Sequence, residues 1–169
     1  MLDGSTMKRV AIFVDVQNIY YTTRQALNAR FDYNSFWRRV TSDRQVVKAT
    51  AFAIDRGDQK QRQFQNILRG IGFEVKLKPF ITRADGSAKG DWDVGIALDV
   101  LDVVTGVDIV VLASGDGDFD VLVQRLRERH AIEVEVYGVP KLTASTLMNA
   151  ATRFVPIDAT LLLKPDAAY

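Results

Sequence analysis

The sequence predicts a three-layer α/β/α domain built around a mostly parallel sheet of five to six strands. The run Val10–Val14 is continuously hydrophobic rather than alternating, which is typical of a strand covered on both faces, and Val107–Ala113 has the same character. Segments of strand and helix character alternate along the whole chain. This alternation indicates parallel strands joined by right-handed crossovers, with helices on both faces of the sheet.

The first half of the chain continues this pattern after the strand at Val10–Val14. The expected elements are helices at 17–29 and Tyr33–Thr41, a strand at Gln45–Ile54, a helix that begins at Asp58, and a strand at Phe73–Leu77. In the third helix, Phe64, Ile67 and Leu68 have the spacing of an inward face. Gly70 and Gly72 are expected to end it.

The second half begins with a polar excursion at 79–89, in which Asp85-Gly86 is typical of the turn of a small hairpin. The expected elements after it are a helix at Asp91–Val104, the strand Val107–Ala113, a helix at 118–130, a strand at Ile132–Tyr137, a helix at 142–151 and a strand at Phe154–Ile157. No repeat or linker interrupts the chain, so we expect one domain over 7–158 and a C-terminal tail over 159–169.

The composition of the 169 residues is that of a globular protein, with 47% hydrophobic and 25% charged residues. No hydrophobic run approaches the roughly 18 residues of a membrane span, and the N-terminal residues lack a signal pattern. The absence of cysteine excludes disulfides and thiolate metal sites. We therefore expect a cytoplasmic protein that does not contact a membrane.

Charge is distributed unevenly along the chain, although the net charge is only +1. Residues 1–90 hold 16 Lys and Arg against 8 Asp and Glu, whereas residues 91–169 hold 6 against 13. Such asymmetry suits a protein that attracts a polyanion with one part and holds cations with another. The alternative is that folding interleaves the two halves and removes the asymmetry in space.

Carboxylates follow the ends of the two most hydrophobic strands. Asp15 follows the first strand, and Asp116 and Asp118 follow Val107–Ala113. In a doubly wound sheet these strands are neighbours, so Asp15 and Asp116 would face each other at the ligand-binding edge. Asp91-Trp92-Asp93 begins the helix that leads to the second of these strands.

Clustered carboxylates repel one another, and a hard divalent cation removes that cost. Oxygen ligands of this kind suit Mg²⁺ or Mn²⁺. The alternative for each aspartate alone is a helix N-cap, since Asp91, Asp116 and Asp118 all precede helices. The single histidine, His130, excludes a two-histidine ribonuclease mechanism.

Three blocks carry a resemblance to a known family: Asp15-x-x-Asn18, Lys89-Gly90-Asp91-Trp92-Asp93, and Ser114-Gly115-Asp116-Gly117-Asp118-Phe119. In this order, and spread from about Val10 to about Ile157, they resemble the NYN domains, a branch of the PIN-like nucleases. The resemblance implies a PIN-like (Rossmann-like) sheet, Mg²⁺ or Mn²⁺ as cofactor, and hydrolysis of phosphodiester bonds, usually in single-stranded or structured RNA. A homodimer is a further expectation at the level of the family.

The resemblance also implies roles for single residues. The metal-binding, catalytic acids would be Asp15, Asp93, Asp116 and Asp118. Asn18 would orient the metal shell or a phosphate, Lys89 would meet the substrate backbone, and Ser114 would support the loop. Asp99 joins the site only if its helix approaches obliquely, because it lies six residues beyond Asp93, roughly 240° around the axis. Thr152 stands where the resemblance leads us to expect an acid.

Contacts to RNA are expected from basic and aromatic side chains near these acids. The basic candidates are Lys76, Lys78, Arg83 and Lys89, with Arg24 on the first helix, and the candidates for base stacking are Tyr20, Tyr21 and Trp92. For each aromatic residue, packing at the edge of the core is the alternative.

Two other classes of function remain open at this point. A non-catalytic RNA-binding or regulatory module would keep the fold and turn over poorly. A phosphotransferase or phosphatase is disfavoured, because Gln17 stands where the dehalogenase pattern has a second acid, and Pro79-Phe80 follows the third strand where a response receiver has its phospho-accepting aspartate.

Overall fold

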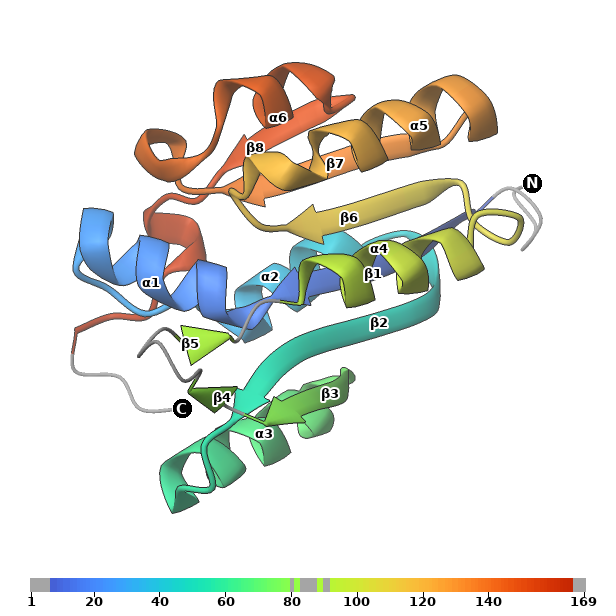
Figure 1. Cartoon of the computed structure of the whole chain (residues 1–169). Coiled ribbons are helices and arrows are strands. Elements are labelled where there is room, and N and C mark those ends of the chain that lie inside the picture. The colour runs from blue at the N-terminus through green and yellow to red at the C-terminus, as the bar shows by residue number, and fades with distance from the viewer. Residues whose placement is uncertain (1–6, 80, 83–87, 90–91, 166–169) are drawn as a thin grey trace.

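The computed structural model describes residues 7–79, 81–82, 88–89 and 92–165 (Figure 1). Its strands are β1 Lys8–Asp15, β2 Arg44–Asp55, β3 Glu74–Pro79, β4 Ile81–Thr82, β5 Ala88–Lys89, β6 Ile109–Ala113, β7 Glu133–Gly138 and β8 Arg153–Pro156. Its α-helices are α1 Val16–Leu27, α2 Tyr33–Thr41, α3 Gln59–Ile71, α4 Asp93–Asp102, α5 Asp120–His130 and α6 Ser145–Ala150. Three short 3-10 helices are η2 Gly117–Phe119, η3 Pro140–Leu142 and η4 Ala159–Leu161.

The main sheet has six strands in the order β3-β2-β1-β6-β7-β8, and all of its neighbours pair in parallel. The predicted three-layer α/β/α class with a parallel sheet is therefore confirmed. From β1, the chain first builds outward through β2 and β3, and then returns to build the other side through β6, β7 and β8. The order reverses between β1 and β6, where Val14 pairs with Ala113. The carboxyl ends of these two strands are the expected place for a ligand.

Helices cover both faces of the sheet, which explains why the central strands are continuously hydrophobic. Val10, Ile12 and Val14 of β1 face one core, to which α1, α2 and α3 contribute residues such as Ile19, Phe36 and Leu68. Ala11 and Phe13 face the other core, under α4, α5 and α6. Successive side chains of a strand point to opposite faces, so a strand buried on both needs no polar residue in alternation.

Several elements differ in extent from the prediction. The helix expected at 118–130 begins instead as the 3-10 turn η2, because the Asp116 carboxylate accepts a hydrogen bond from the Asp118 amide and tightens the first turn. The helix expected at 142–151 is shortened to α6 and preceded by η3. β4 and β5 pair antiparallel, as expected for a small hairpin, and Asp85-Gly86 lies outside the described residues.

The inward face of α3 also differs from the prediction. Leu68 is fully buried, whereas Phe64 and Ile67 are only half-buried. A polar residue, Gln65, takes the second buried position of this helix. Phe64 still packs against the first core from its half-buried position, so the spacing of apolar residues predicted the helix and its inward side but not the depth of burial at each position.

The segment after Ile157 is described to residue 165 and packs on the first core. Leu161 is fully buried, and its carbonyl accepts a hydrogen bond from the Asp32 amide at 2.7 Å. The Leu163 amide donates to the Arg30 carbonyl at 2.8 Å, and Phe31 forms a bridge with Leu162. Within the described residues, no helix has both the length and the apolar character that crossing a bilayer would require.

Candidate metal centre

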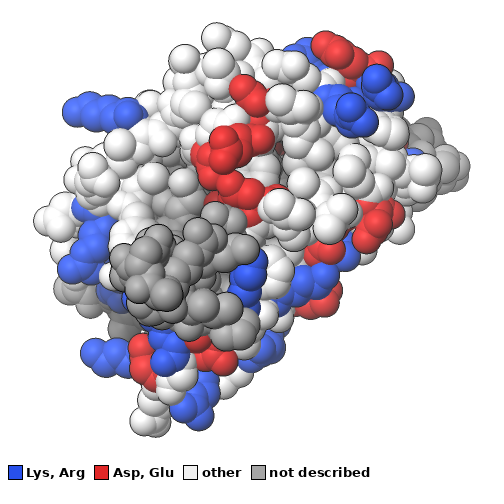
Figure 2. Space-filling view, in the orientation of Figure 1, with Lys and Arg blue, Asp and Glu red and all other residues white. Residues whose placement is uncertain are grey.

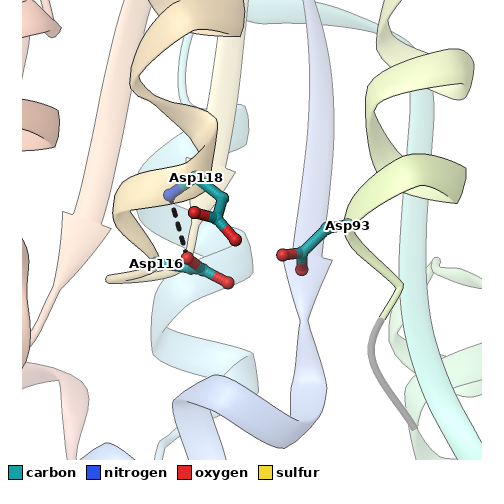
Figure 3. A group of neighbouring side chains, drawn as sticks. All are labelled: Asp93, Asp116 and Asp118. Atoms are coloured by element: carbon teal, nitrogen blue, oxygen red, sulfur yellow. Dashed lines mark hydrogen bonds between the residues drawn. The ribbon is translucent and has the colours of Figure 1, made fainter. Parts of the chain in front are cut away.

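Three aspartates from two elements converge at the carboxyl edge of the sheet. Asp93 is the first residue of α4, Asp116 follows β6, and Asp118 lies in η2. One carboxylate oxygen of each lies within 4.8 Å of those of the other two. Figure 3 shows the Asp93 side chain pointing from α4 toward those of Asp116 and Asp118. In Figure 2, acidic side chains form a patch near the middle of this face.

The loop that carries Asp116 and Asp118 is held by hydrogen bonds within itself. The Asp116 amide donates to the Ser114 hydroxyl at 3.2 Å, and the Asp118 amide donates to Asp116 Oδ1 at 2.9 Å. Polar side chains that bond to backbone amides two residues away are typical of tight turns. The local sequence thus places both carboxylates on the same side of the loop.

A second set of contacts fixes this loop from the segment before α6. The Ala144 amide donates to the Gly115 carbonyl at 3.1 Å. A Cβ at Gly115 would lie 2.8 Å from the Leu142 carbonyl oxygen, closer than such atoms approach, so only glycine fits there. The support from residues 142–144 was not predicted, because nothing in the sequence indicates that this segment folds back on a loop so far before it in the chain.

Asp15 lies beside the three-aspartate group and is held from within the protein. Its side chain is only 7% exposed. Its Oδ2 accepts a hydrogen bond from the Ser114 hydroxyl at 3.2 Å, and its Oδ1 accepts from the Asn18 amide at 3.4 Å, which caps α1. Asp15 does not belong to the group of three, but one hydroxyl links its carboxylate to the backbone of Asp116.

Asn18 joins α1 to the same loop. Its side-chain Oδ1 accepts a hydrogen bond from the Gly115 amide at 2.9 Å. The first turn of α1 therefore holds the loop after β6 through two side chains, Asp15 acting through Ser114 and Asn18 acting directly. Asn18 and Ser114 thus both accept hydrogen bonds from backbone amides of the loop that carries Asp116 and Asp118.

Trp92 anchors the start of α4 and with it Asp93. Its indole Nε1 donates to the Ala53 carbonyl at 2.7 Å, and its ring packs on Phe52 with centroids 5.4 Å apart. The Lys78 ammonium lies 5.3 Å from the centroid of the Trp92 ring. A Cβ at Gly95 would lie 2.6 Å from a carbon of this ring. Trp92 is thus packed in place at the edge of the second core.

The other residues expected near the substrate lie in different surroundings. Arg24 donates to the Tyr20 hydroxyl at 3.1 Å, and Tyr20 and Tyr21 are each about half exposed. Lys76 forms an ion pair with Asp99 at 2.5 Å. Asp99 is therefore engaged by a lysine, and it is not part of the three-aspartate group.

Some predictions fall on residues that the structure does not describe. The backbone of Lys89 belongs to β5, but its side chain, like Arg83 and Asp91, lies outside the described residues. Thr152 precedes β8, and its hydroxyl accepts a hydrogen bond from the Val134 amide near the start of β7. Because parallel strands share their direction, this is the opposite edge of the sheet from Asp116. A residue at 152 is therefore not a ligand of the acidic group.

The donor set of the group fits a hard divalent cation. It offers only carboxylate oxygens, the ligands that Mg²⁺ and Mn²⁺ prefer. Asp93 and Asp116 are half-buried and Asp118 is exposed, which leaves room for water ligands and for a phosphate. In the part of the chain that the structure describes, it is the one group of three potential metal ligands found within this distance.

The fold is that of the PIN-like nuclease superfamily, its acidic group could bind a metal ion, and the comparison with known proteins identifies the branch. Residues 9–158 match the model of the NYN domain, so the chain belongs to the NYN domain family. It is 28% identical over 159 residues to the Low amplitude and bright protein LabA of Synechococcus elongatus, a match that covers 89% of this chain and 84% of the relative. It is also similar to the crystal structure of a protein of unknown function from Vibrio parahaemolyticus, with 55% identity and a TM-score of 0.90 over 96% of this chain and 100% of that one.

Proposed function

We propose that this NYN domain is a metal-dependent ribonuclease that hydrolyses RNA phosphodiester bonds. The observation that carries the proposal is the convergence of Asp93, Asp116 and Asp118 within 4.8 Å at the switch point of the sheet. Three carboxylates this close offer several oxygen ligands to one hard divalent cation. Membership of the PIN-like nuclease superfamily supports the same reading.

We assign two roles to the residues of this site: some bind the cation, and others hold the cation-binding residues in position. Asp93, Asp116 and Asp118 bind Mg²⁺ or Mn²⁺. Asp15, Asn18 and Ser114 fix the loop that carries two of these acids. The Asp15 carboxylate is the candidate for a fourth ligand. A divalent cation held by these residues would supply Lewis-acid chemistry, activating a coordinated water and stabilising charge on the attacked phosphate.

Substrate contacts are proposed around this centre. Lys89 meets the RNA backbone, while Arg24 and the half-exposed rings of Tyr20 and Tyr21 contact nucleotides that flank the cleaved bond. For Trp92, its hydrogen bond and its packing on Phe52 support the alternative of a positioning residue that fixes Asp93. A cytoplasmic location and a homodimer stay predictions.

The test is cleavage of labelled single-stranded and structured RNA by purified protein with Mn²⁺, Mg²⁺ or a chelator. Asp116→Asn should reduce cleavage at least about a hundredfold, because a charged ligand of the cation is lost. Asp102→Asn is the matched control, since Asp102 is exposed at the end of α4 and does not belong to the group. It should cleave like the parent protein.

Two outcomes would contradict the proposal. Equal cleavage in chelator and in Mn²⁺ would show that no cation is needed. Retention of RNA without cleavage under every metal would favour the alternative of a non-catalytic RNA-binding or regulatory module.

A further inference from the structure

A cavity of about 490 Å³ opens between α1 and α3, on the opposite side of the β1 and β2 carboxyl ends from α4. Its wall is formed by α1, the segment that follows it, the end of β2, and the first half of α3. The cavity was not predicted from the sequence, because its walls come from four segments that are separated along the chain. Its shape and its lining residues indicate the kind of molecule that it binds.

The walls of the cavity are largely aromatic. Tyr20 and Tyr21 lie at its α1 side with their rings edge-to-face at 5.3 Å. Tyr33 and Phe64 lie at its inner side, with ring centroids 5.5 Å apart. Flat apolar surfaces at a half-open cavity suit a flat ring, and bases stack on such surfaces without regard to their identity.

Two buried polar side chains, Thr23 and Gln65, line this aromatic cavity. Gln65 is only 4% exposed, and among the described residues no hydrogen bond of its carboxamide is recorded. Two other buried polar side chains are bonded, since Thr23 donates to the Ile19 carbonyl and Thr143 donates to the Val139 carbonyl, whereas the buried Thr50 hydroxyl has no partner in the described part of the chain. Within the described residues, only the Thr50 hydroxyl is fully shielded from solvent without a partner, so the Gln65 carboxamide is accessible from the cavity and can bond to a ligand there.

The carboxamide of Gln65 offers one donor and one acceptor side by side. That pair matches the edge of a nucleobase, and glutamine pairs with adenine through the amino group and ring nitrogen of the base. The rim of the cavity also carries the cationic residue Lys60, which is exposed in the first turn of α3. A phosphate attached to the base would meet a favourable field there.

Two parts of the cavity wall connect to the surroundings of the acidic group, each through an intervening residue. Val16 and Gln17, which line it, directly follow Asp15. Ala53 also lines it, and the Ala53 carbonyl holds the indole of Trp92 beside Asp93. A strand of RNA that crosses the ends of β1 and β2 would therefore bring a base to the cavity and a nearby phosphate to the carboxylates.

We propose that this cavity is a nucleobase site with a preference for adenine, read by Gln65 between aromatic walls. As a subsite for the base beside the cleaved bond, it rests on the proposed ribonuclease function. The same contacts would bind the adenine of a free nucleotide, so the test distinguishes an adenine within RNA from a free adenine nucleotide.

The experiment measures binding by isothermal titration calorimetry to the full chain carrying Asp116→Asn, so that RNA stays intact. Ligands are AMP, UMP, and short oligonucleotides of adenosine or uridine. Adenine-containing ligands should bind more tightly than their uracil counterparts. Adding Gln65→Met, which keeps the size of the side chain and removes its hydrogen bonds, should weaken adenine binding about tenfold and abolish the preference.

Gln63→Met is the matched control, because Gln63 lies on the exposed side of the same helix. It should leave both affinities unchanged. The thermal midpoint of the Gln65→Met variant should equal or exceed that of its parent, since an apolar side chain replaces a buried amide. A loss of adenine binding with that midpoint retained is therefore not a loss of folding.

The outcomes distinguish RNA from a free nucleotide as the ligand, and they distinguish failure of the base site from failure of the ribonuclease proposal. Tight binding of oligoadenosine with weak binding of AMP supports the RNA subsite, and equal binding of both supports a free nucleotide. Binding that depends on Gln65 in a protein that never cleaves RNA would overturn the ribonuclease and keep the base site. Metal-dependent cleavage with no adenine preference, or a preference that survives Gln65→Met, would overturn the base site alone.

Discussion

At the scale of the single residue, the Asp116 side chain has one stabilising and one destabilising effect on the folded protein. Its Oδ1 caps η2 by accepting from the Asp118 amide, which stabilises the loop. Its carboxylate also lies within 4.8 Å of the oxygens of Asp93 and Asp118, which repels them. Repulsion between the carboxylates lowers the stability of the folded protein, and a bound cation would remove this repulsion.

Removing one charge should therefore stabilise the protein without metal and weaken its response to metal. We expect Asp118→Asn to raise the thermal midpoint by about 1–2 °C in chelator, from roughly 0.5 kcal/mol of relieved repulsion. In the parent protein, Mn²⁺ at about 100 times its Kd should add about 2.7 kcal/mol. Differential scanning calorimetry measures both effects, with Asp102→Asn as the control. An unchanged response to Mn²⁺ in Asp118→Asn would remove Asp118 from the site.

Gly95 is needed where the Trp92 ring lies over the first turn of α4. A Cβ there would stand 2.6 Å from the ring, and an indole held by Ala53 and packed on Phe52 has little room to move. We expect Gly95→Ala to cost about 1–3 kcal/mol of stability. It should also lower cleavage by at least about tenfold, because Asp93 shifts with Trp92. Urea denaturation and steady-state kinetics measure the two effects.

Gly70→Ala serves as the control for this substitution. A Cβ at Gly70 meets nothing within 4 Å, and the residue lies within α3. Alanine there should stabilise the protein by up to about 1 kcal/mol and leave cleavage unchanged. If both glycine variants behave alike, the contact between residues 92 and 95 does not position the acid.

At the scale of elements, hydrogen bonds join the first turn of α1 to the loop after β6. The end of β1 pairs with the end of β6, Ser114 bonds to Asp15, and Gly115 bonds to Asn18. The acids of the loop therefore keep their places through contacts made by a helix that contributes none of the three ligands. Such supports hold the geometry of metal ligands, and their loss commonly weakens metal binding.

Asn18 gives the sharpest test of this connection. Asn18→Leu removes the acceptor for the Gly115 amide, and we expect Mn²⁺ affinity and kcat each to fall about 10–100-fold. Asn18→Asp keeps an oxygen at the same place and should restore most of the affinity. Metal titration followed by calorimetry separates this effect from folding, which circular dichroism monitors. Equal affinities in the parent protein and in Asn18→Leu would mean that the loop holds its shape alone.

At the scale of the whole molecule, the last described segment packs behind residues that line the cavity. Leu161 is fully buried, and the backbone around it bonds to residues 30 and 32 between α1 and α2. Arg30 and Phe31 of that segment line the cavity beside Gln65. The C-terminal segment thus supports the surface on which we propose that a base binds.

We expect Leu161→Ala to lower the free energy of unfolding by about 2–5 kcal/mol, the usual cost of truncating a buried leucine. Leu163→Ala is the control and should cost less, because Leu163 is only half-buried. Urea denaturation of both variants measures the difference. Equal and small losses would show that this segment does not belong to the core.

The sequence alone determined the class of fold, the parallel sheet and the carboxylate composition of the candidate site. Continuous hydrophobic runs and the alternation of strands with helices report which faces are covered, and these patterns are local. They placed aspartates after β1 and β6 and at the start of α4, and the sheet brought these ends to one edge.

Only the tertiary structure decided which of these side chains meet. Asp15 and Asp93 were equal candidates in sequence, but packing turns Asp15 toward Ser114 and Asp93 toward the loop. The sequence left undecided whether Asp99 joins the site, and in the structure Asp99 forms an ion pair with Lys76 of β3. Gln65 had no sequence signal beyond a polar residue beside an apolar stripe. A periodic pattern fixes the face on which a side chain lies, whereas the distances between segments far apart in the chain depend on how all the elements pack together.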